Sequence, residues 1–516
     1  MTAAIAVVVL GVKCLTTDTT EPTSPSPTPV VGRSAPRPAS TEVMLVLGKG
    51  GLAVRIRDQE GVPIPARLTF VGVGGTRRPA FTTTDIGLEA PGAVLAFDRA
   101  FTRGDAMLQL PPGSYDVWVS HGPEWDAVAK RVTIVVGATA TLDAVLRHVV
   151  ETPGWLSGDF HVHAAKSFDS KVPMRDRVLQ FVADGVDLIV ATDHNVIADY
   201  GPVIAELGLS ASLASLQGDE ITTHDWGHFG AFPLAGDDAE AGRGAIPVGK
   251  RTPTALFADI RSRFPGAVLD VHHPRLENGR IGYFHLAELD SKSLHAKRPG
   301  FSMDFDAIEV LNGYQDPDRH SVDAVLADWY VFLRHGYHIT ATGNSDSHHL
   351  TFNLGGYPRN YVRVADDRPD RLDVTALVAS IKAGRSFFTT GPFVEVTIGD
   401  RGLGDTVVAV NGEVTLQVAI RAPGWISVDR VTVIVDGRAV LVRPTTGPPP
   451  VRFDGLLRVP VARDSFVIVR VDGDRPMAPI IGDDDKFRVY PLAITNPIWV
   501  DADGDGKITP DVPEPP

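Results

Sequence analysis

The stretch GDFHVHAAKSFDSKVPMRDRVLQFVADGVDLIVATDHN, residues 158–195, predicts a strand, a helix and a second strand in succession. The first strand ends on His161 and His163, which flank a single valine, and alternate residues of a strand point to the same face. The segment VPMRDRVLQFVADGV carries apolar residues at a helical period. The apolar run LIVA follows, and Asp193 and His194 come shortly after it. The unit therefore predicts parallel strands with polar side chains at their carboxyl ends.

The same alternation continues through residues 151–395. Two more helices are predicted, each closed by a glycine, in DAVLADWYVFLRHG and VTALVASIKAG. Further buried strands are predicted in SLASLQGDE, GAVLDVHHP, FDAIEVLNG and YHITATGNSDSHH. Repeated strand–helix units predict an α/β domain with a parallel sheet, and their number favours a barrel.

Sandwich-like β modules are predicted on both sides of this domain. Residues 41–150 contain short runs such as LAVRIRD, ARLTFVGV, DVWVS and RVTIVVG, separated by turns such as GVPIP and PPGSY. This segment is similar to carboxypeptidase-regulatory-like and transthyretin-like accessory modules. Residues 396–500 return to the same pattern in VTLQVAIRAP, VDRVTVIVDG and SFVIVRVDG. We expect two accessory β domains around one α/β domain.

Residues 1–40 have the composition of an export signal followed by a linker. The apolar run over residues 3–12 is too short to span a bilayer and matches the core of a signal peptide. Residues 15–40 are rich in Thr, Ser and Pro, as in the tether of an exported protein. We expect a periplasmic or cell-surface protein with Cys14 as a candidate lipid anchor. No basic residue precedes the run, and Lys13 stands before the cysteine, so a disordered tail on a cytoplasmic protein is the alternative.

Composition and charge limit the function classes. The chain has 516 residues, 43% hydrophobic and 22% charged, which fits a soluble protein of several domains. The net charge of −14, with no basic stripe, leads us to expect no nucleic-acid partner. The single cysteine excludes a disulfide framework and thiolate zinc sites. The oligomeric state stays open.

Ligand-type side chains follow the predicted strands of the middle domain. Of the 16 histidines, 14 lie within residues 158–349. Because the carboxyl ends of parallel barrel strands meet on one face, these side chains are expected to converge. One H-x-H alone is more often structural, but burying five such clusters without a cation would be costly. Imidazoles and carboxylates suit Zn, Mn or Fe, and the candidates are His161, His163, Asp193, His194, Glu220, His272, His273, Asp346 and His348.

These motifs also resemble a known family. HVH, TDHN, GDE, HHP and GNSDSH occur in the order found in the PHP (polymerase and histidinol phosphatase) superfamily. The closer similarity is to its CehA/McbA-type metallohydrolases, through GHFGAFPL and FDAIEVLNG. The resemblance covers residues 155–395. It implies a distorted (β/α)7 barrel that holds two or three divalent metals.

The resemblance also implies roles for single residues. His161 and His163 would bind one metal together with Glu220 and Asp346. Glu220 would bridge to a second metal, which His273 would also bind.

A third metal would be bound by His194, His348 and an acidic residue that follows the H-x-H motif. The family often has that acid five residues after the second histidine, where this chain has Phe168. We therefore carry the role to Asp169. His272 is expected to support the ligands rather than bind metal. Two further residues, either ligands or structural groups, are Glu309 and Asn312.

The chemistry expected from such a centre is metal-assisted hydrolysis of an ester, carbamate or phosphoester in a small-molecule or polymer-linked substrate. Asp193, Asp346 or His228 would move the proton, although Asp193 has the alternative role of a ligand or of orienting His194. Arg275 and Arg359 are candidates for binding a phosphate, with ion pairs at the barrel rim as the alternative.

A binding protein is the alternative function. Flanking β modules suit an exported, metal-containing protein whose PHP-like barrel has lost catalysis. Retention of nearly all the ligands favours the enzyme. A serine hydrolase is disfavoured because the chain has no G-x-S-x-G motif.

The tail DADGDGKITPDVPEPP, residues 501–516, contains the D-x-D-x-D-G pattern of a calcium loop. Asp501, Asp503 and Asp505 are the candidate ligands of a weak Ca²⁺ site. Val512 stands at the twelfth position, where such loops carry an acid. A solvated acidic turn is the alternative.

Overall fold

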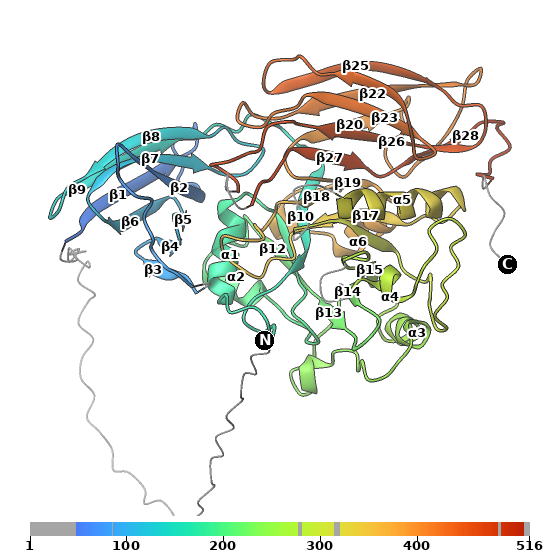
Figure 1. Cartoon of the computed structure of the whole chain (residues 1–516), viewed down its shortest axis with the longest axis horizontal. Coiled ribbons are helices and arrows are strands. Elements are labelled where there is room, and N and C mark those ends of the chain that lie inside the picture. Colours follow the sequence, from blue (N-terminus) through green and yellow to red (C-terminus); the bar gives the residue numbers. More distant parts are fainter. Residues whose placement is uncertain (1–47, 85, 277–280, 314–319, 483–486, 510–516) are drawn as a thin grey trace, which may run out of the picture. The chain divides into compact units, whose positions relative to one another are not determined.

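The strand–helix–strand unit predicted from the sequence is present (Figure 1). β10 (Trp155–Val162) pairs in parallel with β11 (Leu188–Ala191), and α1 (Met174–Ala183) connects them. The apolar face of α1, which includes Val178 and Phe181, is buried, as its helical period predicts.

The structure is a computed structural model that describes residues 48–84, 86–276, 281–313, 320–482 and 487–509. Among these residues, no helix has the length and apolar character needed to cross a membrane. The predicted export signal, the linker and Cys14 lie outside the described residues. Export and lipid anchoring therefore stay predictions.

The strands of the middle domain lie in two sheets. In the first, neighbouring strands follow the order β12 (Ala214–Gln217), β11, β10, β18 (Arg359–Arg363) and β19 (Ser386–Thr389). The second runs in the order β13 (Asp219–Thr222), β14 (His228–Phe232), β15 (Val268–Val271), β16 (Ala307–Asn312) and β17 (Thr340–Asn344). β15, β16 and β17 are parallel, whereas β14 is antiparallel to both of its neighbours.

The predicted (β/α)7 barrel is not shown by these ladders, although the mixed α/β class is. Gly218 interrupts the chain between β12 and β13, and antiparallel pairs at β14 and β18 replace two of the expected strand–helix repeats. The two sheets are not joined into a cylinder. Within the part of the chain that the structure describes, isolated bridges connect them, among them the parallel bridges of His194 with Glu220 and of Val162 with Ser347. These bridges lie at the strand ends that carry the candidate ligands.

The other helices cover the second sheet and the edge of the first. α5 (His320–Arg334) and α6 (Val374–Lys382) match the two helices predicted from the sequence. α3 (Pro253–Arg263) was not predicted, although Thr252 caps it by accepting a hydrogen bond from the Ala255 N–H. The remaining short helical segments are α2 (Gly201–Glu206), α4 (Tyr283–Leu286), η1 (Ala241–Arg243) and η2 (Pro369–Arg371).

The N-terminal module consists of two sheets around one core, as a β-sandwich requires. One sheet contains β6 (Asp105–Leu110), β1 (Gly50–Arg57) and β9 (Thr139–Val145). The other contains β3 (Leu88–Ala90), β4 (Ala93–Ala96), β5 (Arg99–Thr102), β2 (Ala66–Val73), β7 (Gly113–Ser120) and β8 (Val128–Ile134).

The C-terminal strands also form two layers, but one layer continues the sheet of the middle domain. β20 (Phe393–Thr397), β22 (Glu413–Arg421) and β25 (Val451–Pro460) form a separate sheet. β19 pairs directly with β27 (Leu492–Thr495), as the ladder and Figure 1 show. The sheet then extends through β26 (Ser465–Asp472), β23 (Arg430–Val435), β24 (Arg438–Pro444), β28 (Ile498–Asp501) and β21 (Thr406–Val408). The described residues pack as one compact unit, and the finer division into domains stays a prediction.

Candidate metal centre

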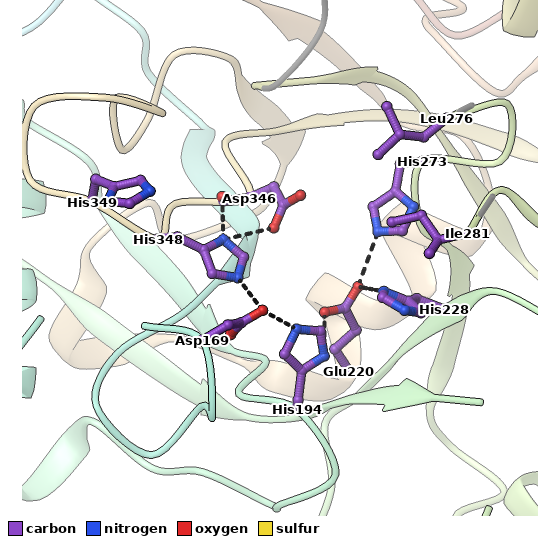
Figure 2. A pocket seen from close by; sticks show the side chains of 10 residues that line it. All are labelled: Asp169, His194, Glu220, His228, His273, Leu276, Ile281, Asp346, His348 and His349. Carbon is purple, nitrogen blue, oxygen red and sulfur yellow. Dashed lines mark hydrogen bonds and ion pairs between the residues drawn. The ribbon is translucent and has the colours of Figure 1, made fainter. Parts of the chain in front are cut away.

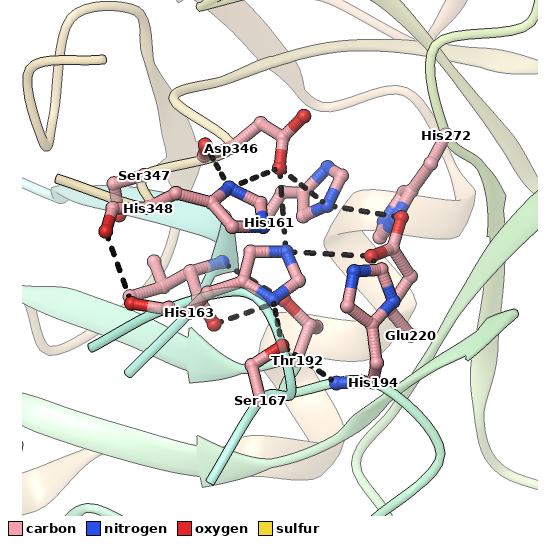
Figure 3. A network of polar contacts seen from close by, with 12 residues as sticks. His161, His163, Ser167, Thr192, His194, Glu220, His272, Asp346, Ser347 and His348 are labelled. Carbon is pink, nitrogen blue, oxygen red and sulfur yellow. Dashed lines mark hydrogen bonds and ion pairs between the residues drawn. The ribbon is translucent and has the colours of Figure 1, made fainter. Parts of the chain in front are cut away.

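His161 and His163 point to the same side of β10, with ring centroids 5.0 Å apart, and both are fully buried. Their Nε2 atoms face two carboxylates that arrive from other strands (Figure 3). His161 Nε2 lies 3.1 Å from Glu220 Oε1 and 3.2 Å from Asp346 Oδ1. His163 Nε2 lies 3.3 Å from Glu220 Oε2 and 3.3 Å from Asp346 Oδ1. The structure thus brings together the four residues predicted to hold the first metal.

Glu220 lies at the centre of the cluster. It comes from β13, and its carboxylate also contacts imidazoles from three other segments. His194 Nδ1 lies 2.9 Å from Oε2, and His273 Nε2 and His228 Nδ1 lie 3.3 and 3.2 Å from Oε1. A carboxylate with both oxygens directed at different imidazoles has the geometry of a bridging ligand.

His272 lies closer to this cluster than predicted. Its Nδ1 is 3.0 Å from Glu220 Oε1, and its ring stacks on His161 at a centroid distance of 3.6 Å. A side chain on Gly230 would collide with the imidazole, because a Cβ there would lie 2.2 Å from His272 Nε2. His161, Glu220 and His272 together have donor atoms near enough to share one cation.

A second group of donors surrounds Asp169. Its Oδ2 lies 3.0 Å from His194 Nε2 and 3.1 Å from His348 Nε2, and Ser167 Oγ donates to its Oδ1. With His163 these side chains could hold one cation. The neighbouring Phe168 is 77% exposed, stacks on the His194 ring and has no donor atom to offer a metal. Asp169 thus directs its carboxylate at the two histidines named with it, and its role as a metal ligand stays a prediction.

Two of the candidate ligands have backbone φ angles in the left-handed region: 29° at His273 and 50° at Asp346. Such angles are uncommon for residues with a Cβ and persist when the surroundings enforce them. The backbone N–H of His273 donates to Glu309 Oε2 at 2.8 Å, and Asn312 Nδ2 donates to Asp346 Oδ2 at 3.1 Å. β16, which carries both partners, therefore fixes these two turns.

Glu309 contacts the ligands from behind, rather than entering the pocket as a further ligand. Its Oε1 lies 3.0 Å from His161 Nδ1, and it accepts hydrogen bonds from Asn344 Nδ2 and Asn312 Nδ2. A carboxylate at Nδ1 fixes the tautomer that leaves Nε2 to bind metal. The sequence left this role open, because the register of β16 decides which face Glu309 occupies.

The donor set fits divalent cations. The Nε2 atoms of His161 and His163 and Oε2 of Glu220 are buried and make no hydrogen bond, although oppositely charged groups surround them. Buried polar atoms normally have a hydrogen-bond partner, and ligand atoms that converge without one suit a shared cation. The set contains nitrogen and carboxylate oxygen only, which suits Zn, Mn or Fe and does not distinguish between them.

The electrostatics agree with this fit. Burial raises the pKa of Glu220, but the imidazoles of His194 and His161 outweigh this effect, so the pKa lies well below its usual value. The pKa of Asp346 is also held well below its usual value, against the effect of burial, by His161 and His348. Both carboxylates are therefore ionised at neutral pH, as metal ligands must be.

Of the three candidate proton carriers, Asp346 lies among the candidate ligands, whereas Asp193 and His228 lie in different surroundings. Asp193 is fully buried, where its Oδ1 accepts from the Ala164 and Ser167 N–H groups and its Oδ2 from the Tyr200 hydroxyl. Burial raises its pKa to about 6. These contacts hold the loop after β10 and do not support proton transfer to a substrate. His228 lines the pocket, and burial lowers its pKa despite the nearby Glu220.

Neither arginine predicted to bind substrate lines the pocket. Arg275 forms a bidentate ion pair with Asp328, with Nε 2.6 Å from Oδ2. Arg359 is 1% exposed and donates to the carbonyl oxygens of Gly356, Gly185 and Asp184. Both arginines make structural contacts. The sequence pattern put them near the ends of predicted strands but could not show which way their side chains point.

Most of the candidate ligands line one pocket with a volume of about 350 Å³ (Figure 2), whereas His161, His163 and His272 do not. Leu276 and Ile281 form an aliphatic wall beside His273 and His228. The other described residues that line it are Asp169, His194, Glu220, Asp346, His348 and His349. None of the described lining residues is a lysine or arginine.

The acidic tail brings together a different set from the one predicted. Asp501 and Asp503 lie near Asp464, from the segment before β26, and the three have oxygens close enough to share a cation. Asp505 is outside this group and accepts from the Lys507 N–H. Val512, in the position of the missing acid, lies outside the described residues. A Ca²⁺ site here stays a prediction.

Comparison with known proteins gives no family assignment. No protein-family model matches this sequence, and no curated protein matches it. Among solved structures, the chain is similar to a two-domain protein from Bacteroides vulgatus ATCC 8482 that contains a predicted PHP-like metal-dependent phosphoesterase. The identity is 17%, the TM-score 0.36, and the match covers 66% of this chain and 97% of that one.

It is also similar to the lesion-specific endonuclease PfuEndoQ from Pyrococcus furiosus. The identity is 15%, the TM-score 0.29, and the match covers 44% of this chain and 56% of that one. The geometry of the site, rather than these distant similarities, carries the functional proposal.

Proposed function

We propose that this protein is a metal-dependent hydrolase of the PHP type, related to the CehA/McbA metallohydrolases. The observation that carries the proposal is the Glu220 carboxylate, which has imidazoles from several strands around both of its oxygens. His161, His163 and Asp346 would complete one metal site, and His273, with or without His272, a second. Asp169, His194 and His348 would form a third.

Divalent cations bound there would supply a nucleophilic hydroxide at neutral pH and charge stabilisation for the reacting ester. Water adds across the bond, so that its hydroxyl joins the acyl or phosphoryl centre and its proton goes to the departing oxygen. His228 is the side chain best suited to carry that proton, because it is neutral at neutral pH and lines the pocket. Asp346 and Glu220 hold the cations.

The pocket favours substrates of low charge. A phosphate monoester carries two negative charges and is usually held by arginine or lysine, and the described part of the pocket offers neither. Its three carboxylates would be neutralised by the bound cations, and the rest of the described lining consists of imidazoles and an aliphatic wall. We therefore infer that the substrate is a phosphodiester, a carboxylic ester or a carbamate.

The expected absence of a nucleic-acid partner rests on the net charge and the lack of a basic stripe, and the comparisons do not support it, since one of the similar structures is a lesion-specific endonuclease. A DNA substrate is for this reason part of the test.

The test is a hydrolysis panel on the full chain loaded with Mn²⁺ or Zn²⁺. The panel contains bis-p-nitrophenyl phosphate, p-nitrophenyl acetate, a p-nitrophenyl carbamate and a single-stranded oligonucleotide. We expect turnover of at least one ester, abolished by chelation. Loss of a residue that only supports a metal ligand lowers activity by ~10–100-fold. Asp346 is proposed as a ligand itself, so Asp346→Asn should lower kcat by at least about 100-fold. The control Asp400→Asn, at a highly exposed carboxylate, should not.

If the metal-loaded wild type is as inert as Asp346→Asn across the whole panel, the enzyme proposal is wrong. The non-catalytic metal-containing binding protein would then be the better account.

A further inference from the structure

A second pocket, with a volume of about 400 Å³, lies at the amino end of β10. His161 stands six residues further along that strand, roughly 20 Å away in extended chain. No described residue lines both this pocket and the pocket of the candidate metal centre. The side chains that bear on its chemistry come from the first sheet, from β20 and from the loop after β20: Trp155, Arg363, Arg385, Glu395, Asp400 and Asp405.

Three of these side chains form a row across neighbouring strands of the first sheet (Figure 1). Trp155 of β10 lies directly opposite Arg363 of β18 in their antiparallel ladder. The Arg363 N–H donates at 2.9 Å to the carbonyl oxygen of Arg385, which comes directly before β19. The two arginines are therefore opposite each other in the sheet, and both line the pocket. Like charges in this arrangement repel each other and lower stability.

Arg363 contacts a carbonyl oxygen and an aromatic ring rather than a carboxylate, within the part of the chain that the structure describes. Its Nη1 donates to the carbonyl oxygen of Pro153 at 3.1 Å. Its guanidinium carbon lies 5.5 Å from the centre of the Trp155 ring. These contacts fix the direction of the guanidinium group but do not neutralise its charge.

The three carboxylates of the pocket do not balance this charge. Asp405 Oδ1 lies 3.3 Å from Arg385 Nη2. Glu395 Oε2 lies 3.0 Å from Nη1 of Arg421, which is not among the described lining residues. The side chain of Asp400 is 91% exposed, so water screens its charge. The positive charge of Arg363 is therefore left over.

We propose that this pocket binds a small organic anion, whose carboxylate or phosphate group lies between the guanidinium groups of Arg363 and Arg385. Guanidinium groups bind both kinds of oxyanion through paired, charge-assisted hydrogen bonds. An oxyanion in this position also removes the repulsion between the two arginines. Val396 and Leu403 give the apolar part of the ligand a surface to pack on. The site does not depend on the proposed hydrolase, because no candidate metal ligand lines it.

The experiment locates and measures the binding of simple probes. Crystals of the Mn²⁺-loaded full chain are grown with 4-bromobenzoate, and anomalous diffraction at the bromine edge locates the ring. We expect a peak in the pocket beside Trp155 and Arg363. Calorimetric titration of the same protein then compares benzoate with the neutral benzamide and with phenylphosphonate. Tighter binding of benzoate assigns a carboxylate ligand, and tighter binding of phenylphosphonate assigns a phosphate ligand.

Variants separate this pocket from anion binding at the metal ions. Arg363→Met should weaken binding of the tighter anion at least about tenfold, the loss expected for hydrogen bonds between charged groups. Asp405→Asn should strengthen it by roughly two- to fivefold, because Arg385 is released from an exposed ion pair. The new amide oxygen can still accept from the Gly402 N–H. A gain in affinity cannot result from misfolding.

Arg443→Met is the matched control, because Arg443 of β24 is also an exposed arginine that donates to a backbone carbonyl oxygen. It should bind the anions as the wild type does, and all three variants should keep the wild-type metal content. A bromine peak at the metal centre only, an Arg363→Met variant with wild-type affinity, or an Asp405→Asn variant that binds no more tightly would overturn the inference.

Discussion

Glu309 is the residue on which the geometry of the centre most depends. Its carboxylate receives hydrogen bonds from the His273 backbone N–H, Asn312 and Asn344, and faces His161 Nδ1. All four partners can donate, so the amide of glutamine would direct its NH₂ group at a donor. Glu309 therefore positions His161 on β10 and the turn after β15 that carries His273.

We expect Glu309→Gln to weaken metal binding by ~10–100-fold, as is usual when the partner of a metal-binding histidine is lost. Competition with a chelator of known affinity measures the change. Glu288→Gln is the matched control, because Glu288 lies on the surface beside Lys297. Unchanged affinity in Glu309→Gln would show that His161 is oriented in some other way.

Metal uptake should release protons. Burial lowers the pKa of His194, but Glu220 and Asp169 outweigh this effect and raise the pKa to about 10. The pKa of His348 is raised to about 10 against the same effect of burial, by Asp346 and Asp169. In the metal-free protein both imidazoles are protonated at neutral pH, so a metal ion must displace those protons. Affinity should therefore rise as pH rises towards these values.

Calorimetry in buffers of different ionisation enthalpy counts the protons released. We expect a release at neutral pH that falls in His348→Asn. An uptake that releases no protons at neutral pH would contradict the assignment of these two histidines.

The residue types of the centre could be predicted from the sequence, whereas their directions could not. The strand-end histidines and carboxylates do converge, and Asp169, the residue after Phe168, lies among them. The same reasoning predicted Arg359 as a substrate-binding residue, but its side chain is buried and donates to backbone carbonyl oxygens. Asp464 could not be found, because nothing in its local sequence connects it with the acidic tail.

At the scale of elements, a buried ion pair joins the N-terminal module to the middle domain. Arg67 of β2 pairs with Asp184 at the end of α1, and both side chains are fully buried. Removing one partner leaves an uncompensated buried charge, so Arg67→Met should lower the free energy of unfolding by about 3–5 kcal/mol.

The double variant Arg67→Met, Asp184→Leu should lose less stability than the single variant, since neither charge remains. Urea unfolding followed by circular dichroism compares them. Arg131→Met serves as the control because its ion pair with Asp116 is exposed, and it should have a much smaller effect. A double variant as unstable as Arg67→Met would refute the account.

Element types were largely predictable, whereas sheet connectivity was not. α1, α5 and α6 follow from their helical periods and the glycines after them. β14 was missed because its short apolar run gives no sign of being antiparallel, and its pairing helps to prevent a regular (β/α)7 cylinder. Pairing partners depend on contacts distant in sequence, which local patterns do not encode.

At the scale of the whole molecule, the C-terminal segment is part of the framework of the site. Asn496, fully buried after β27, donates to the carbonyl oxygens of Ala341 and Ser386 and accepts from the Ala341 N–H. Ala341 lies in β17, the strand that leads to Asp346 and His348. A predicted accessory module therefore supports the strand behind the candidate ligands.

Asn496→Ala should lower the free energy of unfolding by about 3 kcal/mol, because buried backbone groups of both strands lose their partners. Thermal and denaturant unfolding measure this, with the exposed Gln417→Ala as the control. Metal affinity should fall in parallel. Wild-type stability in Asn496→Ala would mean that the C-terminal segment is only attached to the middle domain and does not support it.

We expect the side chains around Glu220 to bind several divalent cations. Anomalous diffraction at the manganese edge, from crystals of the full chain grown with Mn²⁺, tests it most directly. We predict at least two peaks: one among His161, His163, Glu220 and Asp346, and one on the other side of Glu220 towards His273. A map of the Mn²⁺-loaded protein with no peak beside Glu220 would contradict the account.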